Sequence, residues 1–302
     1  MSRQSKRTPK TVLGLIFVVF YAAACQPQQT GEDPGRAAAL DNGDAMSREH
    51  AGDSATPSEA ASIPAERAVV AETLAYAEVN DELRYGHFVI PADMVDPLPA
   101  LIVIHEWWGL NDGVRAVADR LAGLGYIVLA VDLYGGKIAA TPADARKLML
   151  DVVENPEDAK ENIRQAYQFL EQTAGAPSIG SLGWCFGGGW SLNTALLFPD
   201  QLDATVIYYG QVTDDEAKLE PMNVPILGIF GAEDKGIPVA SVRGFEQALE
   251  NLSKDYEIEV YPGVGHAFAN PSGNNYNAAA ADKAWQRTVA FLNRHLAIHD
   301  EK

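Results

Sequence analysis

One stretch of the sequence, residues 178–197, restricts the possible folds more than any other. It begins with a short apolar run at 179–182 and ends in an apolar pattern with helical spacing. Between these parts lies Cys185, with Gly183 two residues before it and Gly187 two residues after it. A strand, a tight glycine-flanked turn and a helix form the arrangement called a nucleophile elbow. The stretch therefore predicts that Cys185 stands at the end of a strand and the start of a helix.

The position of Cys185 favours a reactive thiol. Unpaired N–H groups and the helix dipole at a helix N-terminus lower the pKa of a thiol and stabilise an oxyanion. The alternative is a core cysteine beside a glycine-rich bend, because unpaired cysteines are often buried.

Composition limits the domain count and the partners. With 302 residues, 47% of them hydrophobic, the chain can form one domain of roughly 200–250 residues plus additional segments. Its net charge of −18 disfavours binding to nucleic acid or to anionic lipid surfaces. We expect a monomer that binds a small molecule.

The first 24 residues are typical of a signal peptide. A basic start precedes an apolar run at 12–24, which is too short for a comfortable membrane span. Small residues directly before Cys25 resemble a bacterial lipoprotein signal, so we expect a lipid on Cys25 and an anchor in the cell envelope, at the outer membrane or in the periplasm. Ordinary signal-peptidase cleavage, giving a soluble periplasmic protein, is the alternative.

We expect residues 25–68 to form a disordered tether, because this segment is rich in small, acidic and proline residues and nearly lacks large apolar side chains. His50 lies in this segment and is expected to be solvated. The folded domain is expected to span 69–302.

The domain alternates strand and helix patterns. A hairpin is expected from 72–79 and 83–90, turning at 80–82. Further strands are expected at 100–104, 126–131, 179–182, 204–209, 224–230 and 256–261, the last near a sheet edge, with its odd-numbered residues outward. Helices are expected at 112–124, from 141, at 155–172, 190–197, 238–252 and 278–298. This order predicts an α/β fold with a mostly parallel sheet covered by helices on both faces.

Candidate catalytic residues follow the strands, where the chemistry of parallel sheets gathers. His266 follows the last strand and suits a general base for the thiol, and Asp234 follows the preceding strand and suits the acid that orients this imidazole. The order Cys185, Asp234, His266 is that of α/β-hydrolases. Glu233 is the rival acid. The remaining histidines are interpreted as structural: His87, His105, His295 and His299.

Several motifs together resemble the dienelactone hydrolase family from about residue 70 to 298. The matching stretches are HEWWGLND (105–112), VDLYGG (131–136), GWCFGG (183–188), GAEDKGIP (231–238), GHAF (265–268) and the tail at 276–292. The resemblance implies an α/β-hydrolase fold with Cys185, Asp234 and His266 as its triad.

The resemblance also implies roles for three residues near the nucleophile. Glu106 would lie near the thiol and help to activate it. The backbone N–H groups of Phe186 and Trp107 would form the oxyanion hole. A carboxylate at the buried end of a strand has a raised pKa and needs a partner, which agrees with this role for Glu106, although a paired structural glutamate is the alternative.

The sequence departs from the family at its substrate carboxylate clamp. The family's arginines would fall near Gly136 and at Asn270, and neither place holds an arginine. We therefore expect an apolar or aromatic ester, lactone or thioester rather than dienelactone. Four residues are the candidates for contacting it, although the aromatic ones can equally be core residues: Trp108, Tyr134, Phe268 and Asn270.

The sequence thus predicts a hydrolase that forms an acyl-enzyme on Cys185. No cofactor and no metal are expected, since Gly109 stands where a zinc helix beginning at His105 needs its second histidine. The alternative function is an exported, lipid-anchored binding protein that retains the hydrolase pocket without turnover.

Overall fold

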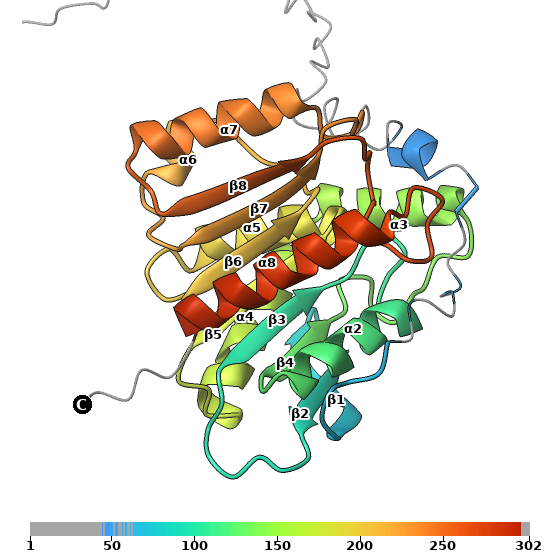
Figure 1. Cartoon of the computed structure of the whole chain (residues 1–302). Coiled ribbons are helices and arrows are strands. Elements are labelled where there is room, and N and C mark those ends of the chain that lie inside the picture. Colours follow the sequence, from blue (N-terminus) through green and yellow to red (C-terminus); the bar gives the residue numbers. More distant parts are fainter. Residues whose placement is uncertain are drawn as a thin grey trace, which may run out of the picture. The chain divides into compact units, whose positions relative to one another are not determined.

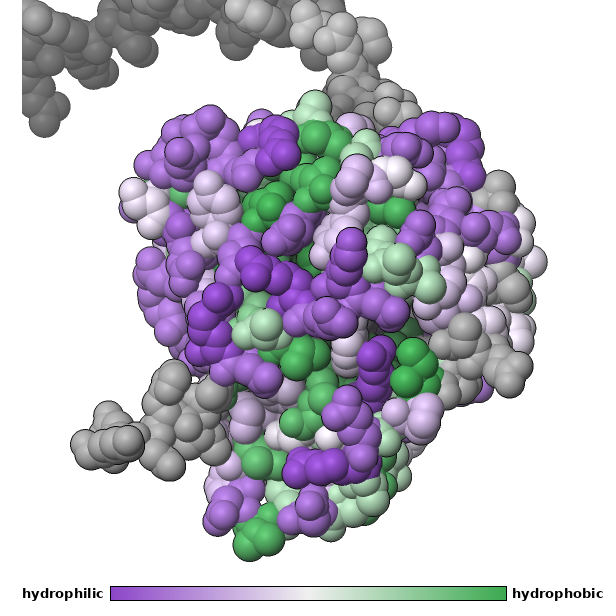
Figure 2. Space-filling view, viewed as in Figure 1, coloured by the Kyte–Doolittle hydropathy of each residue, from purple (hydrophilic) through white to green (hydrophobic). Residues whose placement is uncertain are grey.

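The computed structural model describes residues 44, 46–50, 52, 53, 56, 58, 61 and 63–296. The expected signal segment, Cys25 and His299 lie outside these residues. None of the described helices is both long and apolar enough to cross a membrane. On the face drawn in Figure 2, hydrophilic residues predominate and hydrophobic residues gather in small groups between them.

The core of the molecule is an eight-stranded sheet with the order β1-β2-β4-β3-β5-β6-β7-β8. The pairs β1–β2 and β2–β4 are antiparallel and all other pairs are parallel. The strands are β1 (Val69–Val79), β2 (Glu82–Pro91), β3 (Ala100–Ile104), β4 (Ile127–Val131), β5 (Ile179–Trp184), β6 (Ala204–Tyr208), β7 (Ile226–Gly231) and β8 (Tyr256–Tyr261). The predicted α/β fold with a mostly parallel sheet is confirmed.

Helices cover both faces of this sheet. They are α2 (Asp112–Gly123), α3 (Pro142–Glu154), α4 (Pro156–Gln168) with the π-helical turn η2 (Phe169–Thr173), α5 (Phe186–Leu197), α6 (Glu216–Leu219), α7 (Val239–Asn251) and α8 (Ala278–Leu296). In Figure 1, α2 and α8 lie in front of the sheet, and α4 and α5 lie behind it. The expected helix at 155–172 is therefore an α-helix that ends in a π turn, and α6 was not expected.

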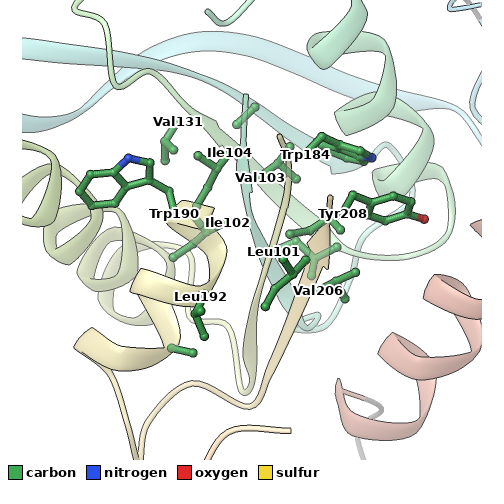
Figure 3. Packing of buried hydrophobic residues seen from close by; sticks show 14 of the residues in the cluster. Leu101, Ile102, Val103, Ile104, Val131, Trp184, Trp190, Leu192, Val206 and Tyr208 are labelled. Atoms are coloured by element: carbon green, nitrogen blue, oxygen red, sulfur yellow. The ribbon is translucent and has the colours of Figure 1, made fainter. Parts of the chain in front are cut away.

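The central strands are continuous apolar runs because both of their faces are covered. All five residues of β3 are fully buried. Side chains alternate along a strand, so Ile102 and Ile104 point toward Trp190 of α5, whereas Leu101 and Val103 point to the other side of the sheet (Figure 3). This packing fixes the carboxyl ends of β3 and β5 side by side.

The N-terminal hairpin forms through a two-residue turn. Asn80 and Asp81 have φ angles of 55° and 61°, the positive values that this tight turn requires and that asparagine and aspartate tolerate well. The hairpin joins the parallel strands through β2, so its expected place in the domain is correct.

Strand β8 is at the edge of the sheet, as predicted, but its acidic face is not simply open to solvent. Glu257 pairs with Arg287 and Arg294 of α8, and Glu259 lies 3.3 Å from Arg287. The expectation that these glutamates point outward was incomplete, because alternation alone does not show that a later helix packs beside that face.

Candidate active site

Cys185 is presented by a turn that only glycine neighbours permit. Its φ angle is 55°, and it directly follows β5 and directly precedes α5. A Cβ on Gly183 would lie 2.0 Å from the carbonyl oxygen of Gly187, and a Cβ on Gly187 would lie 2.2 Å from that of Ile104. These contacts explain the glycine spacing that predicted the elbow.

An acid–base pair lies beside this turn. His266 Nδ1 is 2.8 Å from Asp234 Oδ2, and both side chains are fully buried. The other oxygen of Asp234 accepts hydrogen bonds from the N–H groups of Gly236 and Ile237, at 2.8 Å each. The rival acid Glu233 is exposed. Because backbone donors fix this carboxylate, it holds the imidazole in one orientation and leaves Nε2 for another partner.

The thiol itself contacts two residues from the N-terminal segment. Cys185 Sγ lies 3.8 Å from His50 Nε2 and 3.8 Å from Met46 Sδ. The ligand atoms of His50, Cys185 and His266 all lie within 4.8 Å of one another. His266 Nε2 is buried and has no hydrogen-bond partner among the described residues.

His50 is held in the site by several groups, so the expectation that it is solvated was wrong. Its side chain is fully buried, and its Nδ1 lies 2.9 Å from Asp53 Oδ2. Its ring stacks on Trp107 at 4.5 Å and meets His266 edge-on at 5.3 Å. The described part of the expected tether therefore packs against the domain here. The only sequence signal is the spacing of Met46 and His50, which places both on one face of a helical turn.

The charges in the site depend on burial and on this extra histidine. Burial raises the pKa of the Cys185 thiol, and the hydrogen bond from His50 partly opposes that shift. Burial also disfavours a charged His50, but its hydrogen bonds to Asp53 and Cys185 outweigh burial and raise its pKa to about 9. The resting site therefore favours a cationic His50 beside the sulfur.

Glu106 lies at the end of β3 and accepts hydrogen bonds through both carboxylate oxygens. Tyr209 donates to Oε1 at 3.3 Å and Asn270 donates to Oε2 at 2.6 Å. Burial raises the pKa of Glu106, and electrostatic interactions with His50 and His266 oppose this shift. Asn270 thus contacts Glu106 at the position where the family resemblance implied an arginine.

Replacing Asn270 by alanine is expected to destabilise the protein by about 1–3 kcal/mol, because a buried carboxylate oxygen loses its donor. Urea unfolding measures this cost. In a Glu106→Gln background the same replacement should cost clearly less, since the charge is gone. Equal costs in both backgrounds would mean that the hydrogen bond between Asn270 and Glu106 does not contribute to the stability of the protein.

The expected substrate residues separate into two groups. Trp108 and Asn270 line a pocket that also contains Glu106, Tyr209 and Trp285. The other two pack against rings: Phe268 is fully buried against Tyr209 and Tyr261, and Tyr134 lies against His105 and Phe186. The structure thus favours the core interpretation for Phe268 and places Trp108 and Asn270 at a cavity.

The two residues that were expected to supply the oxyanion donors, Phe186 and Trp107, border this site. A hydrogen bond from the N–H of Phe186 acts to lower the pKa of the Cys185 thiol, and Trp107 is fully buried and stacks on His50. The residues that line the pocket do not include Cys185, whose sulfur is in contact with Met46 and His50.

The other described histidines have structural environments. His105 is fully buried, its Nε2 accepts from the N–H of Leu133, and its Nδ1 contacts the carbonyl oxygen of Glu106 at 2.6 Å. Burial lowers its pKa, so it is neutral. His87 lies 2.8 Å from Asp119 on α2, and His295 packs on Phe291 in α8.

Comparison with known proteins gives consistent matches. The sequence profile described as "Dienelactone hydrolase family" matches residues 86–296. Protein usf of Aquifex pyrophilus is 37% identical over 207 residues, which cover 66% of this chain and 89% of that protein. A carboxymethylenebutenolidase homologue of Saccharolobus solfataricus is 31% identical over 236 residues, covering 66% of this chain and 90% of the relative.

Solved structures agree. A dienelactone hydrolase-type protein from Klebsiella pneumoniae superimposes with a TM-score of 0.68 at 26% identity. The match covers 76% of this chain and 100% of that one. A dienelactone hydrolase-like phosphotriesterase from metagenomic libraries gives a TM-score of 0.69 at 20% identity, with coverage of 76% and 100%, and supports the fold.

Proposed function

The chain belongs to the dienelactone hydrolase family and is a hydrolase of esters or lactones, and we propose that it works through an acyl-enzyme on Cys185. The observation that carries this proposal is the buried His266–Asp234 pair: the imidazole has a nitrogen within 4.8 Å of the sulfur, and its Nε2 has no hydrogen-bond partner among the described residues. An imidazole with a fixed acid on one nitrogen and a free second nitrogen is arranged to accept a proton there.

In the proposed reaction, the Cys185 thiol gives its proton to His266 Nε2 and its sulfur attacks the carbonyl carbon. Asp234 keeps Nδ1 protonated and stabilises the imidazolium. The tetrahedral oxyanion accepts hydrogen bonds from the N–H groups of Phe186 and Trp107. His266 then protonates the leaving alcohol, and the C–O bond breaks.

Deacylation reverses these roles. His266 takes a proton from water, the hydroxide attacks the thioester, and the thiol leaves with the proton that His266 returns. The carboxylate of Glu106 stays bound by Tyr209 and Asn270 during these steps. Its negative charge opposes formation of the thiolate, so Glu106 tunes the nucleophile rather than replacing the base.

The substrate that best fits the pocket is apolar or aromatic at the acyl group. Trp108, Tyr209 and Trp285 line the cavity beside Glu106. Its one described cation is Arg120, whose guanidinium stacks 3.7 Å over the Trp285 ring. Because this planar group already faces an aromatic ring, it is poorly placed to clamp the carboxylate of a substrate. We therefore propose a substrate other than dienelactone.

We also propose that the protein is exported and held in the cell envelope by a lipid on Cys25. The basic start, the apolar run and the small residues before Cys25 support this proposal. Globomycin treatment of expressing cells and mass spectrometry of the mature N-terminus test it, and a mature N-terminus without lipid would contradict it.

Turnover of small activated esters by the purified protein, beside the Cys185→Ala variant, tests the enzymatic proposal. We expect turnover by the wild type, a loss of about 10³-fold or more in the variant, and an acyl mass increase after quenching that only the wild type shows. Equal rates for the two proteins would exclude Cys185 as nucleophile. Tight binding of a ligand that is recovered unchanged would instead support a binding protein.

A further inference from the structure

The thiol of Cys185 lies among more donor atoms than ester hydrolysis requires. A triad needs one imidazole and one carboxylate, whereas here two histidines and a methionine sulfur surround one cysteine. His50 Nε2 and Met46 Sδ each lie 3.8 Å from Sγ, and the reactive atoms of His50, Cys185 and His266 fall within 4.8 Å of one another. Thiolate, imidazole and thioether are the donors that soft and borderline transition metals prefer.

Both imidazoles are held as metal-binding histidines usually are. His50 Nδ1 lies 2.9 Å from Asp53 Oδ2, and His266 Nδ1 lies 2.8 Å from Asp234 Oδ2. A carboxylate on one ring nitrogen fixes the tautomer and directs the lone pair of the other nitrogen to the ion. Two such histidine–carboxylate pairs therefore converge on the same sulfur.

One of these nitrogens is unpaired. His266 is fully buried, and its Nε2 has no hydrogen-bond partner among the residues described. A buried polar atom without a partner costs free energy. A ligand between His266, His50 and Cys185 would satisfy it.

We propose that His50, Cys185 and His266 bind a transition-metal ion, with Met46 as a weak fourth donor, and that copper is the best match. An ion bonded to thiolate and imidazole in tetrahedral geometry holds the sulfur and nitrogen about 3.6 Å apart. The distance of 3.8 Å between Cys185 Sγ and His50 Nε2 is close to this value. Two histidines, one cysteine and a distant methionine form the donor set of copper sites, and divalent copper also exceeds zinc in general affinity.

A bound ion would change the state of the proposed enzyme. The metal takes a lone pair of the thiolate and the Nε2 lone pair of His266, so neither can act on an ester. It also links residues 46–50 to the catalytic domain through His50. This regulatory consequence depends on the proposed function, whereas metal binding itself does not.

Spectroscopic titration of the full-length, metal-free protein tests the site. Under anaerobic conditions, Co²⁺ or Cu²⁺ alone should bind one equivalent and produce thiolate-to-metal charge-transfer absorption. The Cys185→Ala variant should lack this absorption. Competition between Cu²⁺ and Zn²⁺ should favour copper.

Variants of the N-terminal segment separate this site from adventitious binding. Asp53→Asn should weaken the affinity by about 10–100-fold, because it removes an outer-shell partner, and His50→Gln should weaken it at least as much. His87→Gln is the matched control, since His87 pairs with Asp119 on the surface of α2, and it should bind metal as the wild type does. Unchanged affinity in both Asp53→Asn and His50→Gln would overturn the proposal, as would the absence of a charge-transfer band.

The outcomes also distinguish this inference from the proposed function. A protein that shows the thiolate band but hydrolyses no ester retains the metal site and lacks the activity. An active hydrolase whose rate and spectrum do not respond to copper lacks the metal site and keeps the activity.

Discussion

Replacing Asp234 by asparagine is expected to lower kcat for ester hydrolysis by about 10⁴-fold, the size of the corresponding change in a serine triad. The N–H groups of Gly236 and Ile237 donate to Oδ1, so the amide of asparagine would keep its oxygen there and turn its NH₂ toward His266. His266 Nδ1 would then have to accept, and its proton would move to Nε2. An imidazole protonated at Nε2 cannot take the thiol proton.

Steady-state kinetics with an activated ester measure this loss, and urea unfolding checks that the variant is folded. Glu233→Gln is the control, because Glu233 is the neighbouring acid but is exposed, and its rate should stay within about 2-fold of the wild type. A rate for Asp234→Asn near that of the control would show that Asp234 does not orient the base.

The sheet could be predicted because each strand carries its own signal. Buried strands such as β3 and β4 are short apolar runs between polar turns, and they form where expected. The weaker predictions concern features set by packing between distant segments. No local pattern shows that Arg287 of α8 meets Glu257 of β8, or that the end of the helix before β5 winds as a π turn.

The residues of the proposed triad could also be placed from the sequence, since the carboxyl ends of parallel strands share one edge. Asp234 follows β7 and His266 follows β8, the neighbouring strand, so their contact results from the strand order. The choice between Asp234 and Glu233 could not be made from spacing alone. It depends on the turn after β7, where two backbone donors face one carboxylate oxygen of Asp234.

His50 could not be found in this way. Its neighbours in sequence are small and polar, so composition indicated a solvated segment. Its burial comes from Trp107, Asp53 and Cys185, which meet only in the folded protein. A histidine at the end of a weak helical pattern carries no signal of such partners, and the extra contact on the nucleophile is therefore a finding of the structure alone.

Replacing Gly187 by alanine is expected to destabilise the protein by at least about 3 kcal/mol, because the added methyl group would meet backbone atoms that cannot turn away. A Cβ at this position lies 2.2 Å from the carbonyl oxygen of Ile104 and 2.5 Å from that of His105. Relief requires β3 and α5 to separate, which would also displace Cys185. Urea unfolding and the yield of soluble protein measure the effect.

Gly189, two residues further along the same helix, provides the matched control. A Cβ there would approach Gln211 at 3.4–3.5 Å, an ordinary contact. Gly189→Ala should therefore leave the fold intact and stabilise it by about 0.5–1 kcal/mol, because alanine restricts the unfolded chain and favours the helix. Equal stability of the two variants would mean that the close approach of α5 to β3 does not require glycine at position 187. A large loss for Gly187→Ala alone would show that the close approach of α5 to β3 requires glycine at 187.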